Sequence, residues 1–70
     1  MPKLFSSREI ISILEKEGFV FVSQKGSHGK FEHTTFKNII IVPMNKRQIP
    51  QGTLSSIIRQ SGLRRNNFGL

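Results

Sequence analysis

The lack of cysteine in a chain of only 70 residues limits the possible folds more than any other feature of the sequence. A chain of about this size buries only roughly 60% of its unfolded surface, and many small domains compensate with disulfides or metal sites. Without cysteine, neither disulfides nor thiolate–metal sites can stabilise this one. We therefore expect a single domain, residues 1–70, with one hydrophobic core built from a few regular elements.

The beginning of the chain has the signals of an amphipathic helix. Ser6 and Glu9 fit a capping box, in which each side chain satisfies a free backbone N–H of the first turn. Apolar residues then recur at helical spacing until Gly18, which is a suitable left-handed stop. These signals predict a first helix over residues 7–17.

A second apolar stripe near the end of the chain predicts another helix. We expect Thr53 to be its N-cap and Gly62 to end it, because both residue types are favoured at those positions. Residues 64–70 show no periodicity, so we expect a frayed tail.

Three segments between the helices favour strands. Residues 19–24 are rich in β-branched and aromatic side chains, residues 30–35 alternate loosely, and residues 38–42 form an apolar run closed by Pro43. The order predicts an α+β fold, αβββα, with two helices on one face of a three-stranded antiparallel sheet. The other face of the sheet would stay open.

The charge balance indicates a polyanionic partner. Eleven lysines and arginines outnumber four glutamates, which gives a formal net charge of +7. Such a charge attracts nucleic acid through electrostatic steering and counterion release. A basic surface that serves only solubility is the alternative interpretation.

The first twenty residues contain charged side chains and no long apolar run. We therefore expect neither a signal peptide nor a membrane span, and a cytoplasmic location. A membrane surface is a poor partner, because the first predicted helix is the most acidic stretch of the chain.

The inventory of reactive groups excludes most enzyme classes. Aspartate is absent, and three of the four glutamates lie in the first predicted helix. Two-metal nucleases and glycosidases need converging carboxylates, zinc sites need more ligands than two histidines, and a serine triad needs an acidic member. We expect no metal and no cofactor. Metal-independent acid–base chemistry remains, and it suits RNA, whose own 2′-hydroxyl can attack the adjacent phosphate.

One segment gathers the groups that such chemistry needs, with His28 at its centre. A histidine can transfer a proton near neutral pH. Its neighbours bring positive charge, a hydroxyl donor and glycines whose backbone can approach a phosphate: Lys25, Gly26, Ser27, Gly29 and Lys30. An ordinary histidine in a glycine-rich hairpin turn is the alternative.

Other positions have weaker claims to a functional role. Lys46 and Arg47 precede the second predicted helix and would extend a phosphate-binding track. Phe36 could stack on a base, but we expect it to cap the core. His33 lies five residues from His28, so an unbroken strand would put the two on opposite faces, and we expect His33 to have no part in the chemistry.

Five short motifs follow one another along the chain. They are Gly18-Phe19, Lys25-Gly26-Ser27-His28, His33, Val42-Pro43 and Gly52-Thr53-Leu54. Together they resemble the HicA family of toxin ribonucleases over most of the chain. The resemblance implies a double-stranded-RNA-binding-like fold, cleavage of mRNA that arrests growth, His28 as the catalytic residue and a HicB-type antitoxin as partner. Many members carry further histidines where this chain has Gly29 and Met44-Asn45, so the second proton carrier stays open.

These observations lead to the hypothesis of an endoribonuclease toxin that binds mRNA and a HicB-type antitoxin. His28 would be catalytic, and the expected RNA contacts are Lys25, Gly26, Ser27, Lys30, Lys46 and Arg47. Two alternatives remain open. One is a non-catalytic module that binds duplex RNA by shape, and the other is a protein whose charge serves only to bind an acidic partner.

Overall fold

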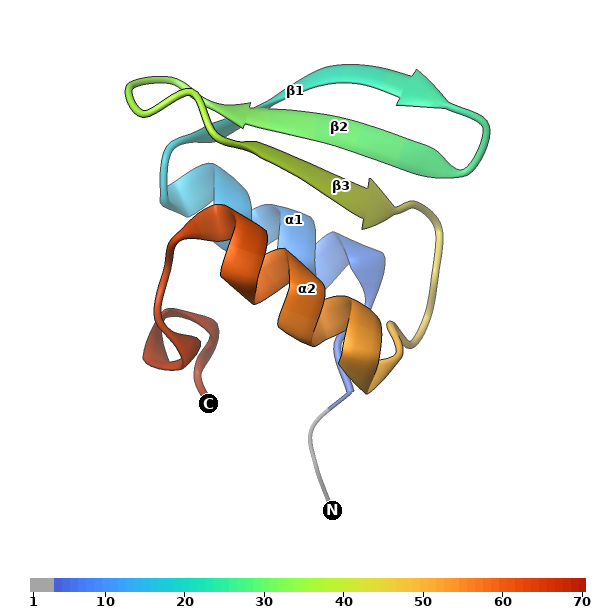
Figure 1. Ribbon diagram of the computed structural model, residues 1–70. Helices are drawn as coiled ribbons and strands as arrows, with labels where there is room; N and C mark the ends of the chain where they lie inside the picture. The colour runs from blue at the N-terminus through green and yellow to red at the C-terminus, as the bar shows by residue number, and fades with distance from the viewer. Residues whose placement is uncertain (1–3) are drawn as a thin grey trace.

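The computed structural model describes residues 4–70 as three strands packed on two helices (Figure 1). The elements in chain order are α1 (Ser7–Lys16), β1 (Phe19–Lys25), β2 (His28–His33), β3 (Ile39–Pro43), α2 (Gln51–Ser61) and the 3₁₀ turn η1 (Arg65–Phe68). The sheet is antiparallel with strand order β1-β2-β3, and both helices lie against the same face. The predicted α+β architecture, αβββα, is confirmed.

Helix α1 begins and ends at the predicted signals. The Glu9 amide donates to Ser6 Oγ at 3.1 Å, and the Ser6 amide donates to Glu9 Oε1 at 2.9 Å, which completes the capping box. Gly18 follows the helix with a φ of 95°, a conformation that glycine adopts without a Cβ penalty. The two ends of α1 are therefore set by local interactions.

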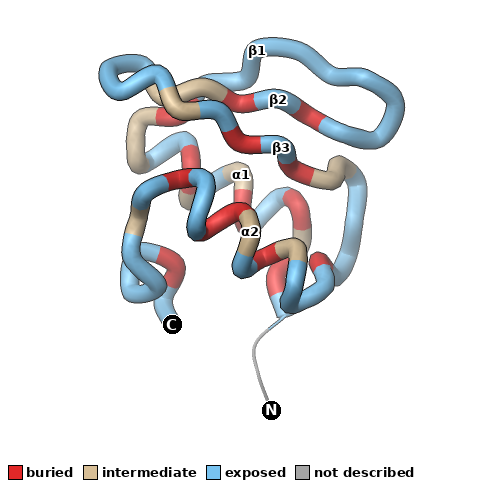
Figure 2. Tube along the Cα trace, viewed as in Figure 1, coloured by how far each residue is buried: buried red, intermediate tan, exposed pale blue. Residues whose placement is uncertain are grey.

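The hydrophobic core lies between the sheet and the two helices (Figure 2). In β2 and β3, buried and more exposed residues alternate, so every second side chain points toward the helices. The buried apolar side chains are Phe5, Ile10, Leu14, Phe19, Phe31, Ile40, Val42, Ile49, Leu54, Ile57, Ile58 and Phe68. Burial of such a side chain stabilises a fold by about 1.5–3 kcal/mol, so this one core replaces the missing disulfides.

The predicted bounds of strand β2 and the predicted start of helix α2 are wrong by a few residues. Strand β2 covers His28–His33, not residues 30–35, and it begins early because the β1–β2 connection is a tight turn whose first residue, Gly26, has a φ of 58°. Helix α2 begins at Gln51 and has Pro50 as its N-cap, not Thr53. Pro50 has a φ of −57°, which proline's ring imposes and which suits the approach to a helix.

The predicted frayed tail is wrong as well. Residues 65–68 form η1, and the Arg64 amide donates to Asn67 Oδ1 at 2.9 Å. Phe68 is only 2% exposed and belongs to the core. A single buried phenylalanine in a short turn creates no periodicity, so the sequence pattern contains no signal for it.

The segment between β3 and α2, residues 44–50, is hydrogen-bonded to the start of α1. The Ser7 amide donates to the Lys46 carbonyl at 2.9 Å, and the Ile49 amide donates to the Phe5 carbonyl at 2.7 Å. The buried Ser7 hydroxyl donates to the Pro43 carbonyl and accepts from the Lys46 amide at 2.9 Å. We call this segment the β3–α2 connection. Its backbone position is set by these bonds.

Candidate functional site

The sheet face that the helices leave open carries three rows of side chains, and each row crosses all three strands. From the β1–β2 turn inward, the rows are Lys25–His28–Pro43, Ser23–Lys30–Ile41 and Val20–Glu32–Ile39. Directly opposed residues in antiparallel strands have Cβ atoms about 4.5–5.5 Å apart. The imidazole and two ammonium groups therefore gather at one end of the open face, and a carboxylate lies at the other.

The first two rows surround a shallow hollow of about 500 Å³, lined by Ser23, Lys25, His28, Lys30 and Ile41. The structure thus brings together three predicted site residues: Lys25, His28 and Lys30. Ser23 and Ile41 were missed. Ser23 reaches this face because the register shifts between Phe21 and Ser23, and no sequence pattern announces that irregularity.

The predicted glycines have different environments. Gly26 occupies the exposed turn with open space around its Cα, as a backbone contact to a ligand would require. Gly29 is buried, and a Cβ at this position would come within 2.6 Å of Met44 Sδ. The interpretation of Gly29 as a phosphate-approach residue is therefore wrong, because its open side is filled by Met44. Ser27 lies in the turn, and its carbonyl accepts from the Met44 amide at 2.7 Å.

His33 points away from the hollow and is held by three hydrogen bonds. Its Nδ1 accepts from the backbone amides of Thr35 and Phe36, both at 3.1 Å, so Nε2 carries the proton and donates to the Glu17 carbonyl at 2.9 Å. The expected structural role of His33 agrees with these contacts. Phe36 does not cap the core as expected, since it is 79% exposed and lies against the His33 ring, with 4.9 Å between ring centroids.

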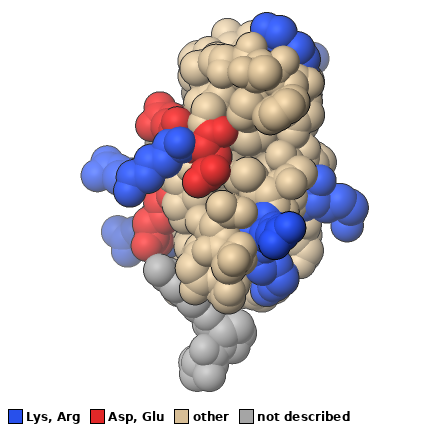
Figure 3. All heavy atoms as spheres, turned by 90° about the vertical axis from the view of Figure 1, so that its left-hand side faces the viewer, with Lys and Arg blue, Asp and Glu red and all other residues tan. Residues whose placement is uncertain are grey.

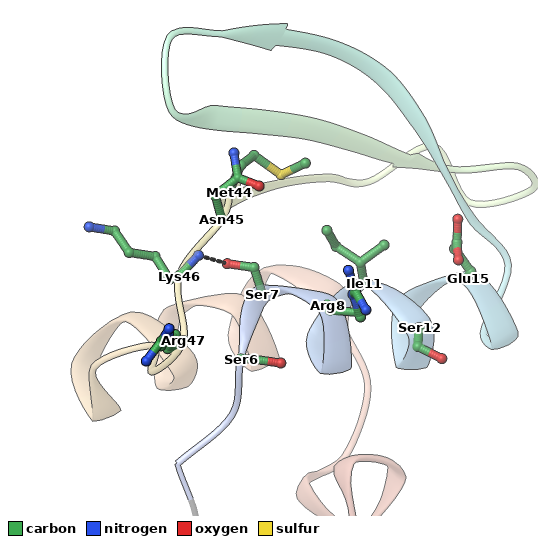
Figure 4. A pocket seen from close by; sticks show the side chains of 10 residues that line it. All are labelled: Ser6, Ser7, Arg8, Ile11, Ser12, Glu15, Met44, Asn45, Lys46 and Arg47. Atoms are coloured by element: carbon green, nitrogen blue, oxygen red, sulfur yellow. Dashed lines mark hydrogen bonds between the residues drawn. The ribbon is translucent and has the colours of Figure 1, made fainter.

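Lys46 and Arg47 are not part of the hollow. They line a separate groove of about 650 Å³ between α1 and the β3–α2 connection (Figure 4). Helix α1 contributes Arg8 and Ser12 to the same groove. Neither residue was expected at a binding surface from the sequence, because both lie in the helix with the most glutamates. The predicted RNA contacts therefore fall into two groups on different surfaces.

Acidic side chains gather away from the hollow. Figure 3 views the end of the molecule opposite to the β1–β2 turn and shows acidic groups along one side, with basic side chains beside them. Among the residues that the structure describes, no carboxylate lines the hollow around His28. Within residues 4–70, no three side chains of a metal-binding type are grouped closely enough to hold a metal ion, and no helix is long and apolar enough to cross a membrane.

Comparison with protein families gives a match that spans both helices and all three strands. The family described as the HicA toxin of bacterial toxin–antitoxin systems matches residues 7–63. The chain belongs to the HicA toxin family. It is therefore the toxin component of a toxin–antitoxin system, and the resemblance carried by the sequence motifs is confirmed. A search of curated proteins finds no significant match.

The family match has a clear boundary in the structure. It includes the hollow and, apart from Ser6, the groove, and it ends one residue after Gly62, the residue that terminates α2. The turn η1, which buries Phe68, lies outside the matched range. Phe5, which precedes the matched range, is also part of the core, so this HicA toxin completes its core with two residues outside the matched segment.

Proposed function

We propose that this HicA toxin is an endoribonuclease that cleaves mRNA in the hollow around His28 without a metal ion. The alignment of His28 with Lys25 in one row, and with Lys30 two positions along β2, carries the proposal. An accessible imidazole between two ammonium groups provides a proton acceptor and positive charge within reach of one phosphodiester. The family match supports this assignment through the toxin class alone.

The proposed reaction uses the substrate's own nucleophile. The imidazole of His28 takes the proton of a ribose 2′-hydroxyl, and the oxygen attacks the adjacent phosphorus. The bond from phosphorus to the 5′-oxygen breaks, and that oxygen takes up a proton from solvent, which reaches this exposed face. The products are a 2′,3′-cyclic phosphate and a 5′-hydroxyl. Lys25 and Lys30 stabilise the negative charge on the phosphoryl oxygens as it grows.

The partner in this proposal is a HicB-type antitoxin that covers the hollow. Three apolar side chains are exposed on the open face: Ile41 in the row of Lys30, and Val20 and Ile39 in the next row. Exposed apolar groups beside charged ones are typical of a surface that a protein partner buries. A partner bound to this face excludes RNA from His28 simply by occupying it.

The decisive experiment compares the wild type with His28→Ala on a labelled mRNA in excess EDTA. We expect cleavage by the wild type, at least a ~10² to 10⁴-fold lower rate for His28→Ala, and 2′,3′-cyclic phosphate ends. Lys16→Ala is the matched control for the effects of protein preparation and of losing one positive charge. Lys16 is exposed on α1 and lines neither the hollow nor the groove. Circular dichroism establishes that each variant is folded.

The outcomes separate the possible functions. Equal cleavage by wild type and His28→Ala would refute the proposed role of His28, and loss of cleavage in EDTA would refute metal independence. Binding of RNA without cleavage by either protein would favour a non-catalytic RNA-binding module. Binding of the HicB-type antitoxin should abolish cleavage, and cleavage by the saturated complex would contradict the proposed masking.

A further inference from the structure

The groove between α1 and the β3–α2 connection is a second surface, outside the hollow, that carries cationic and hydroxyl groups on a partly apolar floor. Its cationic and hydroxyl groups come from Arg8, Lys46, Arg47, Ser6 and Ser12. One carboxylate, Glu15, also lines it, seven residues along α1 from Arg8, so it lies about two helical turns away. Cations and hydroxyl donors that line the same groove are complementary to the phosphates and riboses of a nucleic-acid strand.

The connection displays its cations from a fixed backbone. Lys46 is held through its own amide and carbonyl, both bonded to Ser7, so its side chain takes no part in the anchoring. In Figure 4 the Lys46 side chain extends away from this anchor. Arg47 follows it directly in the chain. A pre-positioned backbone lowers the ordering cost of binding, so a ligand gains more from each charged contact.

The groove and the hollow meet at the end of the sheet. His28 is in register with Pro43, and the next residue, Met44, binds the Ser27 carbonyl of the β1–β2 turn and fills the space beneath Gly29. Met44 is also part of the groove wall. One residue thus separates the two surfaces. A strand bound at His28 needs to pass only the end of β3 to enter the groove.

We infer that the groove binds the sugar–phosphate backbone of the same RNA strand that is cleaved at His28. The identity of the ligand as RNA rests on the proposed function, whereas the groove itself is a binding surface and not a catalytic one. Arg8 and Lys46 contact phosphates on one side of the scissile bond. The RNA strand therefore wraps around the end of the sheet, from the open face to the helical side.

A binding experiment with a non-cleavable ligand tests the groove. The ligand is a labelled single-stranded RNA carrying 2′-O-methyl groups, which block the attacking hydroxyl, and its affinity is measured by fluorescence anisotropy over a series of salt concentrations. The proteins are the wild type, Arg8→Ala, Lys46→Ala and the control Lys16→Ala. The three substitutions each remove one exposed cation, and Arg8 and Lys16 lie on the same helix.

Each groove variant should lose about one phosphate contact. For a single strand, the slope of log K against log salt should become shallower by about 0.7, which corresponds to about fivefold weaker binding near 0.1 M salt. Lys16→Ala should keep the wild-type slope. Equal slopes for Lys16→Ala and both groove variants would overturn the inference, as would a wild type that does not bind.

The experiments distinguish a wrong assignment of the groove as an RNA-binding surface from a wrong assignment of His28 as the catalytic residue. If the salt slopes of the groove variants differ from that of Lys16→Ala as expected while RNA with free 2′-hydroxyls is not cleaved, RNA binding in the groove is supported and the endoribonuclease proposal is refuted. If cleavage occurs, the groove variants should raise KM for a long RNA and leave kcat unchanged. A selective loss of kcat in Arg8→Ala would contradict a role limited to binding.

Discussion

Replacement of Ser7 by alanine should destabilise the domain through the β3–α2 connection. The buried Ser7 hydroxyl serves both the Pro43 carbonyl and the Lys46 amide. Without it, both groups lose a partner, at a cost of about 1–2 kcal/mol each. Alanine's better helix propensity returns about 0.5 kcal/mol, so we expect a net loss of about 2–3 kcal/mol. Natural domains gain about 0.05–0.15 kcal/mol per residue, so a chain of this length would lose about a fifth of its stability or more.

Urea unfolding followed by circular dichroism measures this loss, provided that the m-value is unchanged between variants. Ser12→Ala is the control, because Ser12 is an exposed serine on the same helix and its replacement should change stability by less than about 0.5 kcal/mol. A Ser7→Ala variant as stable as Ser12→Ala would refute the reasoning. It would mean that water replaces the hydroxyl and that the bonds do not hold the connection.

Two further predictions concern the core and the two histidines. Phe68→Ala should lower the free energy of unfolding by about 3–5 kcal/mol, measured by urea unfolding, and a loss below 1 kcal/mol would show that η1 is not part of the cooperative unit. His33→Ala should cost about 1–3 kcal/mol because three backbone groups lose their partner, whereas His28→Ala should leave the thermal midpoint unchanged. Equal destabilisation by both substitutions would contradict the division of roles between the two imidazoles.

The parts of the fold that depend on neighbouring residues were predictable from the sequence. The capping box of Ser6 and Glu9, the left-handed stop at Gly18 and the stop at Gly62 all act within one or two turns of a helix. The three segments that favoured strands, through β-branched and aromatic residues, loose alternation and an apolar run, became β1, β2 and β3. Chain order and amphipathic pattern then left few ways to cover one sheet face.

The arrangement of the candidate site depends on strand register and on hydrogen bonds between residues far apart in the sequence, and the hydrophobic pattern of the sequence does not report either. Lys25, His28 and Lys30 are close in sequence, so their grouping could be predicted. Ser23 joins them only through an irregular register in β1. The separation of Lys46 from the hollow follows from bonds to Ser7, almost forty residues earlier in the chain. No local signal reports such a contact.

The open position of His28 limits which amino-acid substitutions this toxin can accept during evolution. The imidazole lies on the bare side of the sheet, among strands that the helices do not cover, so no element within residues 4–70 lies over it as a lid. In the function proposed above, the antitoxin lies on the same few side chains as the RNA. Substitutions that escape such an antitoxin would then also remove the groups that we propose hold RNA. Resistance to the antitoxin and efficient cleavage are therefore expected to be traits in conflict, and the two partners should change together at this face.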